Sequence, residues 1–192
     1  MTRFAPSLPL LALALLALPI LPSAHAQTAP ATTTAPATAP TGERIINAIT
    51  VTSTQGYKIT VPGGWTPLKN APNVDVAFVG ALRPTVTVTV SDTPPELKVT
   101  LADMRDLYAS QMPKDVPKLK MLGEKIIKVS GQNAVLWSYT GDGDGGKVRW
   151  TQVFTLKNNR LYTVNFVAPV NTPQNLLDSG RAILDSFALT AK

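Results

Sequence analysis

Alternation of apolar and polar residues constrains the fold of this chain more than any other feature of its sequence. In TVTVTV, residues 85–90, an extended backbone places the valines on one side and the threonines on the other. Alternation, or enrichment in β-branched and aromatic residues, marks seven further predicted strands: 45–52, 57–62, 74–81, 125–131, 133–140, 147–156 and 160–167. The sequence therefore predicts a protein built mainly from β-strands.

Short connections determine how these strands pair. Three of them join consecutive strands, at Gln55-Gly56, Gly131-Gln132 and Asn158-Asn159. Glycine and asparagine tolerate the positive φ that tight hairpin turns require. Parallel neighbours would need a crossover of roughly a dozen residues or more, so we expect antiparallel pairing.

The segment 100–112 changes to the helical period. Thr100 is the expected N-cap, Asp103 completes a variant of the capping box, and Pro113 is expected to end the helix. The predicted apolar stripe consists of Leu101, Met104, Leu107, Tyr108 and Met112.

A second helix is predicted over 172–187, with Thr172 as its cap and Pro173 at the first helical position. Gly180 lies in mid-helix, where glycine costs about 1 kcal/mol relative to alanine, so we expect it to permit a close approach to the sheet. Its apolar face comprises Leu176, Gly180, Ile183, Leu184 and Phe187. The predicted fold class is α+β, an antiparallel sheet with helices packed on it.

The first 26 residues have the order of a cleaved export signal. Arg3 precedes the apolar run 10–21, and the small-x-small ending Ser23-Ala24-His25-Ala26 predicts cleavage after Ala26. A membrane anchor is the alternative, but the run is shorter than the ~20 residues that span a bilayer. We expect an exported protein, periplasmic or extracellular, whose mature chain is not stably inserted in a membrane.

Residues 27–42, QTAPATTTAPATAPTG, contain too little apolar surface to offset the entropy of ordering. Their prolines favour an extended, semi-stiff tether. We therefore predict a disordered linker over 27–44 and a single folded domain over 45–192.

The composition excludes several kinds of chemistry. The chain has no cysteine, and its single histidine, His25, leaves with the predicted signal. Ser-His-Asp and Cys-His nucleophiles, the usual structural zinc sites and imidazole-ligated copper are therefore excluded. No P-loop or dinucleotide-binding glycine pattern occurs. We predict a protein that is not an enzyme and needs no cofactor, with a two-carboxylate hydrolase as the catalytic alternative.

The basic charge does not indicate nucleic-acid binding. The formal net charge is +6, and loss of Arg3 with the signal leaves the mature chain at +5, with no run of consecutive lysines or arginines. A charge of this size, spread along the chain, is typical of a solubilising surface.

The segment SYTGDGDGGKVRW, residues 138–150, is the one most similar to a metal site. Its match to a calcium loop stops after Asp142 and Asp144, because Lys147 stands where the loop requires glycine. A hairpin turn accounts for the glycines, and the aspartates keep its tip solvated. We predict a turn, with cation binding by Asp142 and Asp144 as the alternative.

The three tryptophans, Trp65, Trp137 and Trp150, are expected to pack in the core or on a sheet face, as aromatic side chains usually do. The functional alternative is an aromatic contact patch for a binding partner.

The succession GYKITVPGGW, TLADMRDLYASQM, NAVLWSYT, RLYTVNFVAP and ILDSFAL, spanning about 45–189, resembles the PsbP-like and DcrB-like families. Gly56, Tyr57, Pro62 and Trp65 match their aromatic-rich opening, and Ser186-Phe187 matches the end of their last helix. The resemblance implies an α/β/α sandwich, shared with the Ran-binding nuclear-import factor, and a role that is mostly non-catalytic.

The leading functional hypothesis is an exported, non-catalytic envelope protein that binds another macromolecule, expected to be another envelope protein. The first alternative is a small-ligand or lipid-binding module with a closed pocket of ~300 Å³ or more between sheet and helix. The second is the hydrolase, which requires two carboxylates within ~5–10 Å of each other in one cleft.

Overall fold

The structure is a computed structural model that describes residues 48–69, 71–143 and 145–190 of the chain. The predicted signal peptide (1–26) and linker (27–44) lie outside the described residues, as does Asp144 of the predicted turn.

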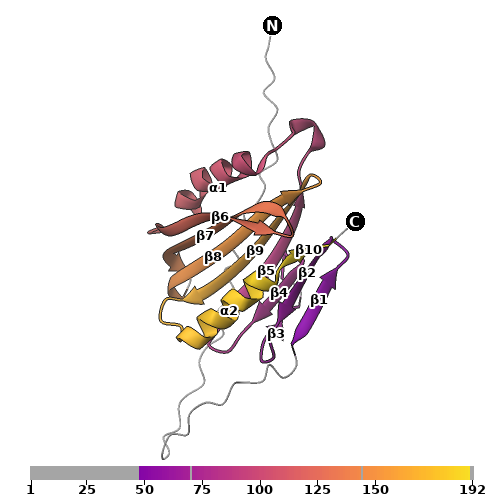
Figure 1. The fold of residues 1–192 in the computed structure, drawn as a ribbon. Coiled ribbons are helices and arrows are strands. Elements are labelled where there is room, and N and C mark those ends of the chain that lie inside the picture. The colour runs from indigo at the N-terminus through magenta and orange to yellow at the C-terminus, as the bar shows by residue number, and fades with distance from the viewer. Residues whose placement is uncertain (1–47, 70, 144, 191–192) are drawn as a thin grey trace, which may run out of the picture.

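Seven strands form the larger of two sheets, in the order β3-β4-β5-β9-β8-β7-β6 (Figure 1). Neighbouring strands are antiparallel throughout, which confirms the pairing predicted from the short connections. The strands are β3 (Thr66–Pro67), β4 (Val76–Val79), β5 (Thr85–Asp92), β6 (Lys120–Val129), β7 (Gln132–Gly143), β8 (Gly146–Lys157) and β9 (Arg160–Pro169).

A smaller sheet contains β1 (Ile49–Ser53), β2 (Tyr57–Val61) and β10 (Ala188–Leu189), in the order β1-β2-β10. The sequence predicts β1 and β2 but neither β10 nor the division into two sheets. A strand of two residues is too short to show alternation. The backbone N–H of Thr60 donates to Ser186 Oγ over 2.9 Å, which ties β2 to the end of the second helix.

Helix α1 (Leu101–Asp115) begins as predicted, with the capping box complete. Thr100 Oγ1 accepts from the Asp103 N–H, and Asp103 Oδ2 accepts from the Thr100 N–H over 2.8 Å. The prediction that Pro113 ends the helix is wrong, because the helix continues through it to Asp115. Pro113 is exposed in the last turn, where the missing N–H removes one hydrogen bond and the helix can still close at Val116.

Helix α2 (Gln174–Ser186) has Pro173 rather than Thr172 at its N-cap, so the predicted cap is wrong by one residue. Pro173 has an extended backbone, ψ 147°, and the Thr172 side chain is buried instead of capping the helix. The expected close approach at Gly180 is confirmed. A Cβ atom at this position would lie 2.3 Å from Cζ of Phe166 on β9.

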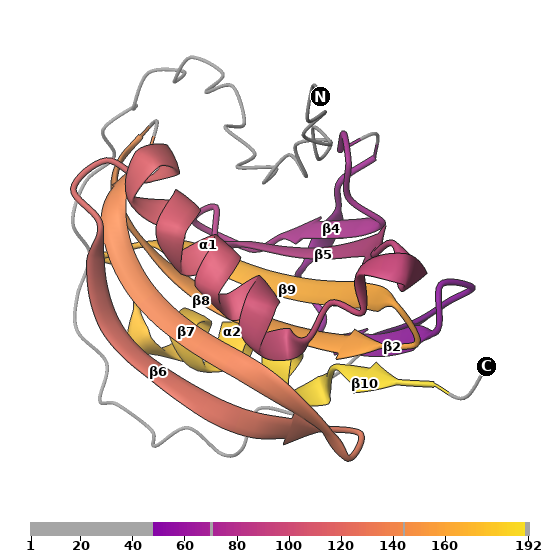
Figure 2. The same ribbon diagram turned by 90° about the horizontal axis from the view of Figure 1, so that it is seen from above.

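The two helices lie on opposite faces of the large sheet (Figure 2), so the predicted α/β/α sandwich is confirmed. The small sheet shares the α2 face. Each face has its own apolar cluster. On the α1 face it comprises Met104, Tyr108, Met112, Val116, Val135, Trp137, Tyr139, Trp150, Phe154 and Leu161.

Tight turns connect β6 to β7 and β8 to β9 in the large sheet. Asn158 and Asn159 have φ of 51° and 58°, as their predicted turn requires. The β6–β7 turn consists of Ser130 and Gly131, one residue earlier than predicted. A short 3₁₀ turn, η1 (Pro95–Leu97), precedes α1.

Candidate functional site

Strand β6 is the last strand of the large sheet, and none of the strands in the described ranges pairs with its outer edge. Its ten residues are exposed except Ile127 and Val129. Three of its large apolar side chains are exposed to solvent: Met121 (42%), Leu122 (46%) and Ile126 (60%). A long exposed edge is a ready template for pairing with another chain, and proteins usually shorten or cover such edges.

The β6–β7 turn determines which backbone groups face outward. Two residues form the turn, so the flanking pair Val129↔Gln132 exchanges both backbone hydrogen bonds. Alternation along β6 then directs the N–H and C=O of Ile127 and Lys125 toward β7. Those of Lys128, Ile126 and Glu124 point away from the sheet. The unpaired edge is regular from residue 124 to residue 128, because the pairing shifts between Met121 and Gly123.

Charge along this edge is predominantly positive. Lys120, Lys125 and Lys128 are exposed, and none of them makes an ion pair within the described part of the chain. Glu124 is the one acidic residue of the strand, and Arg105 of α1 contacts it with Nε at 2.5 Å from Oε1 and Nη2 at 3.3 Å from Oε2. This guanidinium lowers the pKa of Glu124. The negative charge of Glu124 is therefore already paired with Arg105, whereas the three lysines can pair with acidic side chains of a partner.

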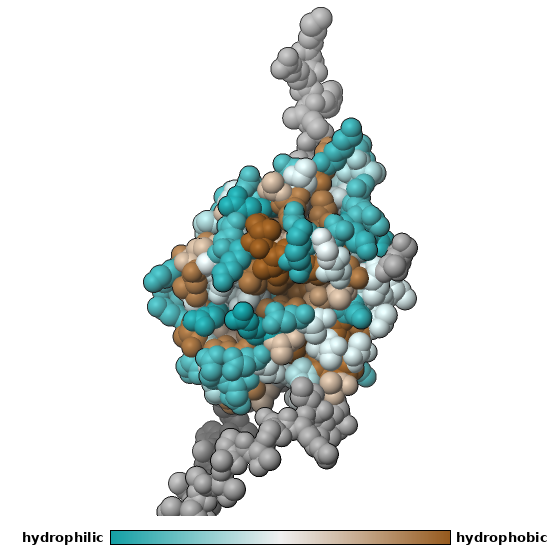
Figure 3. Space-filling view, viewed as in Figure 1, coloured by the Kyte–Doolittle hydropathy of each residue, from teal (hydrophilic) through white to brown (hydrophobic). Residues whose placement is uncertain are grey.

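Figure 3 shows an apolar area bordered by hydrophilic side chains on the face viewed in Figure 1, over the region of the β6–β7 hairpin and the adjoining strands. Apolar side chains near this hairpin include the partly buried Ile127 and Leu136 on the α2 face. Apolar and charged side chains are thus mixed along the exposed edge.

The sequence did not identify this edge. The predicted strand 125–131 omitted residues 120–124, because KMLGE lacks alternation. The mixture of lysines with apolar side chains on both faces was the available signal, since lysines are common on exposed edges.

The three tryptophans are buried, and only Trp137 lies next to β6, directly opposite Glu124 on the neighbouring strand. Trp65 is 7% exposed and donates from Nε1 to Ser179 Oγ of α2 over 3.1 Å. Trp137 is 1% exposed and lies edge-on to Phe154, whereas Trp150 stacks on Tyr139 at 5.3 Å between ring centroids. They form no exposed aromatic patch, and their burial favours the packing interpretation.

The aspartate-glycine loop is the predicted hairpin turn, because Gly143 pairs with Gly146 at the end of β7 and β8. Asp142 Oδ2 lies 2.7 Å from Lys118 Nζ, so this carboxylate already forms an ion pair with a cationic side chain. Gly141 allows the segment after α1 to pack on the hairpin, since a Cβ there would lie 2.4 Å from Val116 Cγ1. No group of three acidic, histidine or cysteine side chains suited to a metal occurs in the parts of the chain described here.

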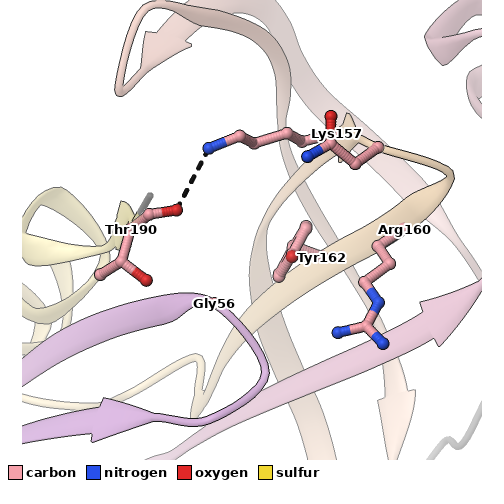
Figure 4. Close-up of a pocket in the computed structure, with 6 residues that line it drawn as sticks. Gly56, Lys157, Arg160, Tyr162 and Thr190 are labelled. Carbon is pink, nitrogen blue, oxygen red and sulfur yellow. Dashed lines mark hydrogen bonds between the residues drawn. The ribbon is translucent and has the colours of Figure 1, made fainter. Parts of the chain in front are cut away.

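Two hollows flank the β1–β2 turn. The first, of about 150 Å³, is lined by Gly56, Lys157, Asn158, Arg160, Tyr162 and Thr190 (Figure 4). Lys157 Nζ donates to the Thr190 carbonyl over 3.2 Å, while Arg160 extends away from it and pairs with Asp92 at 2.8 Å. The two cations therefore do not converge on a common anion.

The second hollow, of about 370 Å³, is open and lined by Gln55, Asn73, Val74, Asp75, Val90 and Ser91. Asp75 accepts hydrogen bonds from Ser53 Oγ at 2.7 Å and from the Tyr57 hydroxyl. Burial, and next the hydrogen bond to Asp75, raise the pKa of Tyr57. Tyr57 is therefore a neutral donor that fixes the carboxylate, and the arrangement is structural.

No helix within the described residues is long and apolar enough to cross a membrane.

No family model matches the chain, and no curated protein matches it by sequence. Solved structures nevertheless share its architecture, and they define it as an α+β sandwich of the PsbP-like fold. Cyanobacterial PsbP (CyanoP) from Synechocystis superposes with a TM-score of 0.59 at 16% identity, covering 79% of this chain and 98% of that one.

Two further structures extend the comparison. LpqN of Mycobacterium tuberculosis, described as involved in cell envelope biogenesis, gives a TM-score of 0.56 at 15% identity and covers 76% of this chain and 91% of its own. The Ran-binding protein Mog1p of Saccharomyces cerevisiae gives 0.53 at 12%, with 74% and 95% covered. The PsbP-like fold and its similarity to the Ran-binding factor are thus confirmed, and the similarity extends to the fold alone.

Proposed function

We propose that this chain is an exported envelope protein that acts by binding another protein, without catalysis. The observation that carries the proposal is the ten-residue edge strand β6, on which Met121, Leu122 and Ile126 are 42 to 60% exposed. Exposed apolar side chains on an unpaired edge are costly to keep unless a partner covers them. Among proteins of this fold, Mog1p is described as Ran-binding and LpqN as involved in envelope biogenesis, which supports the same kind of role.

Export is proposed from the first 26 residues, whose order is that of a cleaved signal. Residues 27–44 would then form a semi-stiff segment at the mature N-terminus, about 55 Å long if fully extended as polyproline II.

The two alternatives have less support. A lipid or small-ligand module needs a closed, aliphatic cavity, whereas both hollows described above are lined mainly by polar side chains. A hydrolase needs two free carboxylates in one cleft. Asp106 and Glu124, two carboxylates that share a neighbour, are both engaged by the guanidinium of Arg105.

Site-specific photocrosslinking in cells that naturally produce the protein tests the proposal. A photoreactive amino acid at Ile126 on β6 is compared with one at Thr52, an exposed position on β1 in the other sheet. We expect one discrete protein adduct from position 126 and none from position 52. The proposal fails if position 126 gives no adduct, or if both positions give the same set of adducts.

A further inference from the structure

We propose that the partner binds as an additional β-strand on the free edge of β6, and that its pairing segment has the pattern acidic-apolar-apolar-acidic. This inference rests on the proposed protein-binding function and specifies its mode and the chemistry of the partner.

The backbone of β6 supplies the first part of the argument. The N–H and C=O groups of Glu124, Ile126 and Lys128 point away from the sheet, at the regular spacing that a neighbouring strand requires. An added strand can therefore make main-chain hydrogen bonds along this edge without disturbing the bonds between β6 and β7. The shift in pairing at Met121 and Gly123 limits the site to residues beyond it.

The side chains of residues 125–128 supply the second part. The segment 125–128, KIIK, has a lysine at each end and two isoleucines between them, so its pattern of charged and apolar residues is the same in both directions. Residues directly opposite each other on neighbouring strands interact, and opposite charges stabilise the pair by roughly 0.2–1 kcal/mol. The complementary segment places acids opposite Lys125 and Lys128 and apolar residues opposite Ile126 and Ile127. The pattern is symmetrical, so it fits a parallel or an antiparallel strand.

A second copy of the same chain is the obvious competitor for this edge. Residues whose backbone groups face outward must lie opposite each other in an antiparallel pair of two copies, so Ile126 can lie opposite Ile126 of the copy but not opposite Ile127. In that register Lys125 lies opposite Ile127 at both ends of the pair, and the Glu124 opposite Lys128 is already held by Arg105. An acidic partner instead places a free opposite charge against both Lys125 and Lys128, so the two lysines favour it over a second copy.

The test uses the purified protein and two fluorescent, capped peptides, each with a central tetrapeptide flanked by threonines. One carries Glu-Val-Val-Glu and the other carries Lys-Val-Val-Lys. Fluorescence anisotropy should show saturable binding of the acidic peptide alone, weakening as salt rises from about 0.05 to 0.5 M because screening reduces the attraction. The double variant Lys125→Glu/Lys128→Glu should reverse the preference and bind the lysine peptide.

A backbone variant tests strand addition itself. Ile126→Pro removes an N–H that faces outward, so the β6–β7 hydrogen bonds and the melting temperature should be nearly unchanged. Binding of the acidic peptide should fall at least about tenfold, since main-chain hydrogen bonding is blocked. The control Ile126→Thr shortens the apolar side chain but keeps the N–H, and it should bind more tightly than Ile126→Pro.

The outcomes separate this inference from the proposed function. Strand addition is overturned if the charge reversal leaves the peptide preference unchanged, or if Ile126→Pro binds as well as Ile126→Thr. An adduct from position 126 in cells, together with either of those results, retains protein binding but rejects an acidic strand. The absence of that adduct rejects the proposed function whatever the peptides do.

Discussion

Replacement of Gly180 by alanine tests the packing of α2 on the large sheet. The new Cβ would lie 2.3 Å from Cε2 and Cζ of Phe166 and 2.6 Å from its Cδ2, whereas carbon atoms in contact prefer about 3.5–4.0 Å. Phe166 is 3% exposed and packs against Trp65, so the ring has little room to move. The helix or the ring must therefore shift by more than 1 Å, on the order of the difference between those distances.

Two opposing effects determine the magnitude. Alanine is favoured over glycine in a helix interior by about 1 kcal/mol, whereas overpacking a core costs about 1–3 kcal/mol and occasionally more. With the steric overlap at the upper end of that range, we expect a net loss of about 1–2 kcal/mol in the free energy of unfolding. The melting temperature should then fall by roughly 3–8 °C.

Urea denaturation followed by circular dichroism measures this loss. Ala182→Gly, at an exposed position of the same helix, is the matched control and should lose about 1 kcal/mol through helix propensity alone. In a Phe166→Leu background, Gly180→Ala should be less harmful, because part of the ring has been removed. The reasoning is refuted if Gly180→Ala stabilises the protein by about 1 kcal/mol, as it would in an unconstrained helix.

Three further predictions concern the charges and the processing of the chain. Arg105 lowers the pKa of Glu124 from its ordinary value of 4.5, so the pair stabilises the fold above that pH and the contribution is lost as the pH falls through the lowered pKa. The melting temperature of Glu124→Gln should accordingly decrease less than that of the wild type on acidification below pH 4.5, and equal decreases would contradict this. Because Lys118 already pairs with Asp142, calorimetric titration with millimolar calcium should give no binding heat; a saturable heat that Asp142→Asn abolishes would restore the cation site. Mass spectrometry of the exported protein should find Gln27 at its N-terminus, whereas an intact signal segment would disprove cleavage after Ala26.

Features set by neighbouring residues could be predicted from the sequence. The capping box of Thr100 and Asp103 and the positive φ of Asn158 and Asn159 depend on a few consecutive residues, and both are confirmed. The close approach at Gly180 could be predicted because glycine destabilises a helix interior and is kept there mainly where a side chain would not fit. The Phe166 ring occupies the space that a Cβ at this position would need.

Features that depend on distant parts of the chain could not be predicted. The strand Ala188–Leu189 exists because it pairs with Tyr57–Lys58, and no local pattern reveals that pairing. The edge position of β6 likewise follows from the order of seven strands, so the exposure of Ile126 becomes visible only in the sheet. Local periodicity predicted the strand itself, but its edge position depended on pairings elsewhere in the sheet.

The small sheet also bears on when the molecule can finish folding. Its central strand is held by contacts such as that between Thr60 and Ser186, which are 126 positions apart. Contacts of such long range close late, because the loop entropy must be overcome before they form. A polypeptide being threaded through a translocation channel would keep its opening hairpin incomplete until residues 186–189 had passed. A chain cut short before Ser186 should accordingly leave β1 and β2 open to proteolysis.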